Sequence, residues 1–268
     1  MNQDLLVRLT AEWKPVPLYN IWRLIALSEL DDAFELIYAQ QVIDYVREHL
    51  FCEVGFSFTG KRDDIVPCYN AMILEALCKL GLADSEEVEV AVNWIRQYQF
   101  FAHGGMSEWD GRGILKYGGC LQATPCYIGV AKTVKALLVY QRTASKAAPW
   151  VAELIENGMA VIKQHQFCFR LTNGKPISKH IMETAFPASY VLSINELAEI
   201  AWLSGNSNDE STAKMKQYLL DIRDDAGMWG VMYQYKGDGY ISFDGGKRQS
   251  PWITDRLNRF LFAEESLG

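Results

Sequence analysis

Four of the six cysteines in this 268-residue sequence stand at positions where thiols can do chemistry. Cys68 and Cys126 each follow a proline directly, in Pro67-Cys-Tyr and Pro125-Cys-Tyr, where a helical run begins. Cys52 and Cys120 lie in the loops before those runs. Helix N-termini stabilise thiolates, which bind zinc or act as nucleophiles. We therefore expect a site drawn from these four cysteines, with zinc as the candidate cofactor and with Cys68 and Cys126 as candidate catalytic thiols.

A purely structural role for the same cysteines is the alternative. Their spacings are wider than the Cys-x-x-Cys knuckle of structural zinc sites, and free cysteines are often buried as small apolar residues. Cys78 and Cys168 are expected to have this packing role. His103 or His165 could replace one thiol in a metal site.

Charged residues in the same loops are a second candidate set. Asp110, in Trp109-Asp-Gly-Arg112, is the first choice for general acid or base work. Cations near the helix starts are expected to form a positive rim that accepts an anionic headgroup, unless they are ordinary solvated loop residues. The rim residues that we single out are Arg112, Lys247 and Arg248.

Aromatic residues recur near the same helix starts. They are Tyr19, Tyr69 and Tyr127, each two residues after a proline, with Tyr190 and Trp252 close to that phase. Such rings could line an apolar pocket and stabilise a carbocation with their π faces. The alternative is that they are core residues.

Helical periodicity runs through almost the whole chain. Ile73, Ala76, Leu77 and Leu80 form one apolar stripe at helical spacing, and Phe34, Ile37, Tyr38 and Val42 form another. The one strand signal is a candidate hairpin between Gly230–Tyr235 and Tyr240–Phe243. The predicted class is all-α.

Five prolines stand just before helical runs, at intervals of 50 to 64 residues. Proline suits the first position of a helix because its missing N–H has no partner there. A period of this length, made of helix, turn and helix, predicts stacked helical hairpins in a single domain over residues 1–268. The prolines are Pro17, Pro67, Pro125, Pro187 and Pro251.

Composition narrows the class of function. The net charge of −7 argues against a nucleic-acid partner, because phosphate binding needs a basic face. No apolar run reaches the ~20 residues of a membrane span, and the first residues lack the apolar core of a signal peptide. We expect a cytoplasmic protein. P-loop, Rossmann, G-x-S-x-G and H-E-x-x-H motifs do not occur.

Three segments carry a family resemblance, at residues 119–137, 186–190 and 246–257. They resemble the prenyltransferase and squalene-cyclase repeat superfamily. The chain looks most like small bacterial members described only as squalene-cyclase-like. The resemblance covers nearly the whole chain and implies an α/α toroid. Its inner and outer helices would form an incomplete barrel of about five hairpins, with a cavity for an apolar, isoprenoid-like substrate.

The chain departs from the superfamily's catalytic patterns. It has no D-x-D-D acid motif, only Asp pairs such as Asp31-Asp32, and no segment matches the Asp, Cys and His zinc ligands of protein prenyltransferases. We expect a terpenoid-cyclase- or prenyltransferase-like protein, with its reaction class and its status as an enzyme open. One alternative is a non-catalytic toroid that binds a lipid-like ligand or a protein. Another is an α/α-barrel glycoside hydrolase that pairs Asp110 with Asp63 or Asp244.

Overall fold

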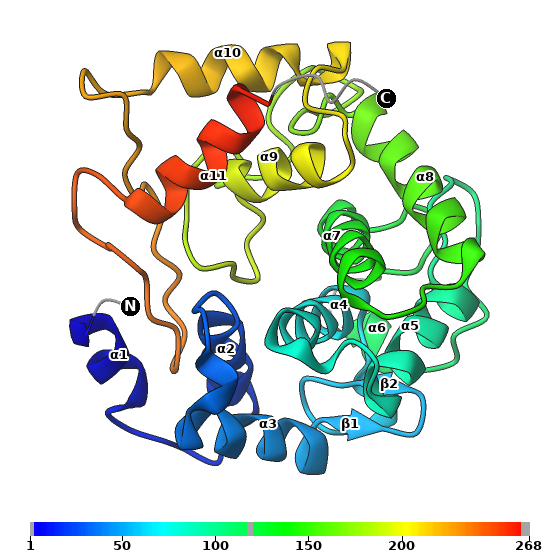
Figure 1. Cartoon of the computed structure of the whole chain (residues 1–268). Helices are drawn as coiled ribbons and strands as arrows, with labels where there is room; N and C mark the ends of the chain where they lie inside the picture. The colour runs from blue at the N-terminus through cyan, green and yellow to red at the C-terminus, as the bar shows by residue number, and fades with distance from the viewer. Residues whose placement is uncertain (1–2, 117–119, 264–268) are drawn as a thin grey trace. The chain divides into compact units, whose positions relative to one another are not determined.

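The computed structural model describes residues 3–116 and 120–263 of the chain. Helices account for nearly all of the regular structure in these ranges (Figure 1). The only strands there are β1 (Phe51–Cys52) and β2 (Gly55–Phe56), which pair antiparallel. The prediction of an all-α protein is confirmed.

The chain divides into two compact units. The first contains residues 1–158 and 237–241, and the second contains residues 159–236 and 242–268. Each unit is described by itself below. The single domain expected over residues 1–268 stays a prediction.

The first unit holds most of the helices, with α8 continuing into the second. Its α-helices are α1 (Gln3–Thr10), α2 (Pro17–Leu27), α3 (Ile37–His49), α4 (Pro67–Leu77), α5 (Glu86–Tyr98), α6 (Gly113–Lys116), α7 (Tyr127–Thr143) and α8 (Pro149–Gln164). Its short turns of helix are η1 (Ala33–Glu35), η2 (Arg62–Asp64) and η3 (Cys78–Leu82).

The helices α2, α4 and α7 form the interior of the first unit. The proline-led starts predicted at Pro17 and Pro67 are confirmed, and α7 begins two residues after Pro125. Nearly every residue of α2 and α4 and the central part of α7 is buried, which is typical of a helix surrounded by protein. Successive members pack against each other, α2 on α4 and α4 on α7, while α3 covers α2 and α5 covers α4. The order of an inner helix followed by an outer one is therefore present in this unit.

Glycines allow α7 to approach its neighbours closely. A Cβ on Gly129 of α7 would lie 3.2 Å from Cβ of Pro67 at the start of α4. A Cβ on Gly158 of α8 would lie 2.3 Å from Cγ2 of Val134 in α7.

Replacing Gly158 by leucine should therefore destabilise the protein. Overpacking of a close-packed contact typically costs about 1–3 kcal/mol. The free energy of unfolding, measured in urea, should fall by that amount. Ala160→Leu on the exposed side of the same helix is the matched control and should change stability little. Equal stability of the two variants would show that the α7–α8 contact accommodates the larger side chain and would contradict this prediction.

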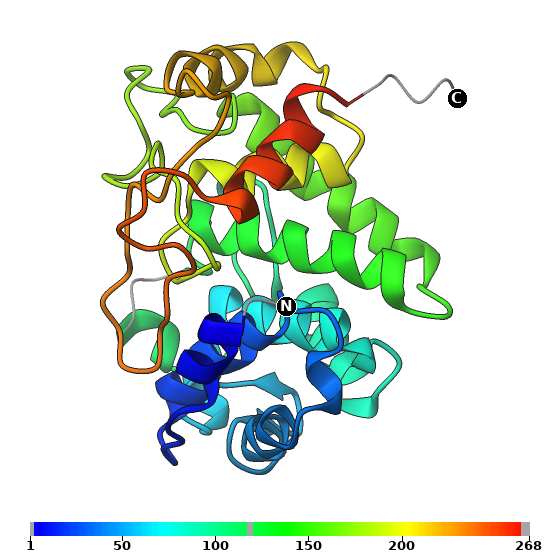
Figure 2. The same cartoon turned by 60° about the vertical axis from the view of Figure 1, so that its left-hand side comes forward.

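The second unit contains α9 (Ile194–Leu203), the short η4 (Glu210–Thr212), α10 (Ala213–Asp221) and α11 (Pro251–Leu261). In this unit α11 packs on α9. Pro251 starts α11 as predicted, with the Ser250 hydroxyl accepting from the Ile253 N–H. Figure 2 shows that the segment between α10 and α11 has no regular structure over most of its length.

The helix start predicted at Pro187 is wrong. Pro187 follows a cis peptide bond, and α9 begins only at Ile194. A capping box of Ser193 and Glu196 sets that start, because each side chain caps a backbone N–H of the other. The Asn195 side chain also binds both backbone groups of Ala185, at 2.9 and 3.0 Å, which holds the segment before Pro187 as a loop.

The predicted hairpin over Gly230–Tyr235 and Tyr240–Phe243 is also wrong, since no strand is present there in the described residues. The backbone groups of this segment bond elsewhere. The N–H groups of Met232 and Tyr233 donate to the Thr184 carbonyl, and Phe243 donates to Phe186.

The apolar stripe predicted through Phe34 and Ile37 does not form. Phe34 lies in η1, after Asp32 with its left-handed φ of 59°, and this turn breaks the helical phase before α3. Ile37 is 88% exposed, while Val42 is fully buried in the side of α3 that packs inward. Among the described residues, no helix is long and apolar enough to cross a membrane.

Candidate functional site

Three of the four predicted cysteines come together where α4 and α7 begin. Cys68 is the second residue of α4, and Cys126 is the N-cap residue of α7. Cys120 lies in the loop before α7, where its thiol hydrogen bonds to the Cys126 sulfur and its carbonyl accepts from the Cys126 N–H at 3.1 Å. The charge of Cys126 acts on both other sulfurs. None of the three cysteines forms a disulfide bond.

Cys126 is the thiolate of this cluster. The hydrogen bond from the Cys120 thiol lowers the pKa of Cys126 to about 6, with help from the backbone N–H groups of Gly129 and Ile128 in the first turn of α7. Burial opposes this shift but does not cancel it. Unlike its two partners, Cys126 is not fully buried. A thiol of lowered pKa at a helix N-terminus is the setting of reactive cysteines.

Cys120 and Cys68 are the neutral members of the cluster. Donating to Cys126, together with burial, raises the pKa of the Cys120 thiol. Burial and the neighbouring Cys126 charge raise the pKa of Cys68 to about 12, against the opposing charge of Lys132. Lys132 is itself 1% exposed and lies on α7. One anionic sulfur is thus held among two thiols and a buried cation.

None of the three clustered thiols acts on Cys52, and the four-cysteine metal site stays a prediction. The Cys52 thiol donates to the Gly60 carbonyl at 3.4 Å, and its charged neighbours are Glu53 and Arg62. Within residues 3–116 and 120–263, no group of three or more His, Cys, Asp or Glu side chains is arranged to hold a metal ion. Cys78 and Cys168 are buried, as expected for packing residues.

Asp110 lies at the surface in a salt-bridge cluster. Its carboxylate is 2.9 Å from the Arg62 guanidinium, which also lies 3.6 Å from Asp63 and stacks over Trp109 at 4.5 Å. Both carboxylates are well exposed and share one cation. This arrangement does not favour the buried acid with a raised pKa that glycoside hydrolysis requires. Arg112 is exposed nearby in the sequence.

Three of the predicted aromatic residues lie in the first unit. Tyr19 is fully buried, its hydroxyl donates to the Glu12 carbonyl, and the Arg23 guanidinium lies over its ring at 4.9 Å. Tyr69 is half-buried and stacks on Phe58 with ring centroids 4.7 Å apart. A substrate-binding role for these rings stays a prediction. Tyr127 is half-buried in the first turn of α7, next to Cys126.

The remaining predicted residues belong to the second unit. Trp252 stacks on Phe186 with centroids 5.6 Å apart, and Tyr190 is half-buried in the loop before α9. Lys247 pairs with Asp244 at 2.6 Å, and Arg248 is exposed. The positive rim and the aromatic ring were predicted from residues of both units, and they stay predictions.

Sequence reasoning missed a buried ion network in the first unit. Glu75 of α4 lies 3.1 Å from Lys135 of α7 and 2.7 Å from Lys79, which also pairs with Glu29 at 2.9 Å. The side chains of Lys135 and Glu75 are only 2% and 7% exposed. The signal was present: charges inside an otherwise apolar helical run are almost never buried unless paired.

The fold and the site together define a mostly helical protein in which three cysteines gather at the starts of α4 and α7. Comparison with protein-family models, with curated proteins and with solved structures finds no significant match for this chain. The functional argument therefore rests on the residues and their geometry.

Proposed function

We propose that this chain is an α/α-toroid protein of the terpenoid-cyclase or prenyltransferase-like class, acting on an apolar, isoprenoid-like substrate through the Cys126 thiolate. The observation that carries the proposal is the cluster of Cys68, Cys120 and Cys126 at adjacent helix starts. In a toroid the starts of inner helices surround the mouth of the cavity. The inner helices α2, α4 and α7, each led by a proline, support this architecture for the first unit.

The chain's own groups suit base chemistry. The Cys126 thiolate can accept the proton that a substrate carbon loses as a double bond forms, because its lowered pKa favours the anion and it is not fully buried. The Cys120 thiol holds the sulfur in place by its hydrogen bond. Positive charge on Lys132 favours an anionic cluster within this buried setting.

Turnover of isoprenoid diphosphates tests this proposal. We expect the purified chain to convert a geranyl, farnesyl or geranylgeranyl diphosphate, with products identified by mass spectrometry. Cys126→Ala should abolish turnover, while Cys52→Ala should retain it, because Cys52 lies outside the cluster. Native mass spectrometry of the untreated protein should also show a co-purified apolar molecule. Turnover that survives in Cys126→Ala, or neither conversion nor a bound apolar molecule, would refute the proposal.

A zinc ion bound by the cysteine cluster is the alternative to a free Cys126 thiolate. A catalytic zinc site uses three protein ligands, but the three sulfurs as they stand in the described residues are not arranged to hold a metal ion, so zinc would require them to move closer together. Elemental analysis of protein purified with thiol protection decides between them. Our proposal expects a substoichiometric zinc content. Roughly one zinc per chain, lost in Cys126→Ala and retained in Cys52→Ala, would replace the free thiolate by a metal-bound one.

A further inference from the structure

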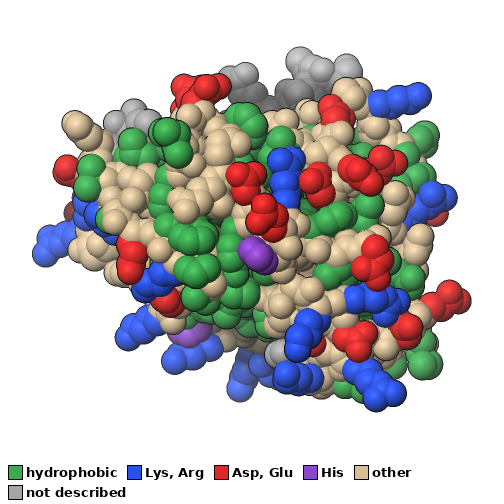
Figure 3. Space-filling view, turned by 90° about the horizontal axis from the view of Figure 1, so that it is seen from below, with side chains coloured by type: hydrophobic (Ala, Val, Ile, Leu, Met, Phe, Trp, Pro, Cys, Tyr) green, Lys and Arg blue, Asp and Glu red, His purple; other side chains and the backbone are tan. Residues whose placement is uncertain are grey.

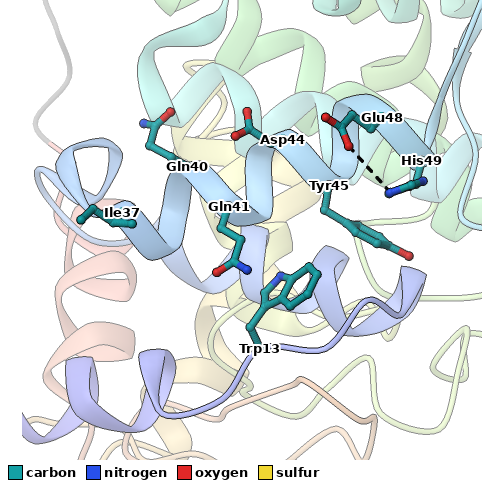
Figure 4. Close-up of a pocket in the computed structure, with 8 residues that line it drawn as sticks. All are labelled: Trp13, Ile37, Gln40, Gln41, Asp44, Tyr45, Glu48 and His49. Carbon is teal, nitrogen blue, oxygen red and sulfur yellow. Dashed lines mark ion pairs between the residues drawn. The ribbon is translucent and has the colours of Figure 1, made fainter.

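A groove on α3 is the second place where chemistry-bearing side chains gather. It has a volume of about 360 Å³, within the range of small-molecule sites. Figure 4 shows two rows of side chains along the helix, one with Asp44 and Glu48 and the next with Gln41 and Tyr45 on the side of Trp13. Every residue that lines the groove belongs to the first unit. The complete lining is Trp13, Ile37, Gln40, Gln41, Asp44, Tyr45, Glu48 and His49.

One row of the groove is acidic. Asp44 and Glu48 stand one helical turn apart, where like charges repel. Within the described part of the chain, the Asp44 carboxylate has no hydrogen-bond or ion-pair partner, and Glu48 has only His49 at 3.9 Å. The lining contains no lysine or arginine. Figure 3, which views the molecule from the α3 side, shows hydrophobic, acidic and histidine side chains close together on this face, with a lysine or arginine side chain among the acids.

The other row is aromatic and apolar. The rings of Trp13 and Tyr45 meet edge to face with centroids 6.0 Å apart, and His49 lies 4.5 Å from Tyr45. Ile37, at one end, is almost fully exposed although it is a large apolar side chain. The Tyr45 hydroxyl and the Gln41 amide have no hydrogen-bond partner within the described residues. The lining therefore offers apolar surface next to unpaired acceptors.

We propose that this groove binds a small organic amine, with its ammonium group at Asp44 and Glu48 and its apolar body on Tyr45 and Trp13. Carboxylates attract the cation, and aromatic faces favour cations over neutral groups of the same shape. A neutral ligand would leave two neighbouring carboxylates unneutralised, and an anionic one would be repelled. The site is independent of the thiol cluster and of the isoprenoid proposal.

A charge series of matched probes tests the groove by isothermal titration calorimetry. 2-Phenylethylamine is the cation, 2-phenylethanol is its neutral counterpart, and phenylacetate is the anion. We expect the amine to bind at pH 7 and the other two to bind at least about tenfold more weakly. Equal binding of the alcohol, or no heat from the amine at millimolar concentration, would overturn the proposal.

Charge-neutralising variants locate the site. The double variant Asp44→Asn/Glu48→Gln should weaken amine binding about tenfold, because it removes the counter-charge without changing side-chain shape. Asp31→Asn/Glu35→Gln is the matched control, since these exposed acids lie outside the groove lining. All four positions are exposed, so the variants should fold, which circular dichroism can verify. Unchanged affinity in the first double variant would refute this location.

Discussion

The alanine variant of Glu75 is expected to lose about 3–5 kcal/mol of unfolding free energy. Glu75 is the partner of both Lys135 and Lys79, and its removal takes a carboxylate at 3.1 Å away from the buried Lys135 ammonium. The side chain of Lys135 is 2% exposed, so water cannot replace the lost ion pair. Desolvation of an unpaired charge is what makes breaking a buried pair so costly. Urea denaturation followed by circular dichroism measures the change.

A double variant separates charge from packing in this prediction. Glu75→Leu/Lys135→Leu removes both charges and keeps apolar volume, so its stability should lie much nearer to the original than that of Glu75→Ala. Lys79 keeps Glu29 as its partner at 2.9 Å in either variant. If Glu75→Ala loses less than about 1 kcal/mol, or if the double variant is as unstable as the single one, the ion pair is not the cause.

Helix starts could be predicted from the sequence where a proline is the only signal that sets the start. Pro17, Pro67 and Pro251 begin helices because proline fixes the backbone for the first turn and nothing else in those segments opposes it. At Pro187 two other interactions override the preference of proline for a helix start. The Ser193–Glu196 capping box defines a stronger start, and the Asn195 amide binds the backbone of Ala185 upstream. Long-range side-chain bonds of that kind have no signature in the sequence near the proline.

The candidate site could likewise be predicted only in part. Cys68 and Cys126 were predicted to meet because equivalent positions on neighbouring repeats meet, and Cys120 follows because it is six residues from Cys126. Cys52 fits the same description in sequence, but its loop turns through β1 and β2 and directs the thiol to Gly60. The α3 groove was not predicted. Its marker in the sequence, Ile37, had been assigned to a buried stripe, and only the turn at Asp32 moves it to the surface.

Alkylation of Cys126 should follow a thiolate with a pKa near 6. Because this pKa is lowered, the thiolate predominates above pH 6 and is lost as the pH falls through that value. Iodoacetamide modification of the peptide that contains Cys126, quantified by mass spectrometry across pH 4 to 9, should therefore rise with a midpoint near pH 6. Buried Cys78 and Cys168 should react far more slowly at every pH, because burial also raises their pKa.

Removing the Cys120 thiol tests the cause of that shift. In Cys120→Ala the hydrogen bond to the Cys126 sulfur is lost, so the alkylation midpoint should move up toward the ordinary thiol range. A thiolate of higher pKa is intrinsically more nucleophilic, which offsets much of the rate loss at pH 7. The contrast is largest at low pH, where we expect Cys126 to react about tenfold more slowly at pH 5 in the variant.

Cys120→Ser keeps a hydroxyl donor and should shift the midpoint less. A midpoint that stays near pH 6 in Cys120→Ala would assign the thiolate to the first turn of α7 alone, where the N–H groups of Ile128 and Gly129 remain.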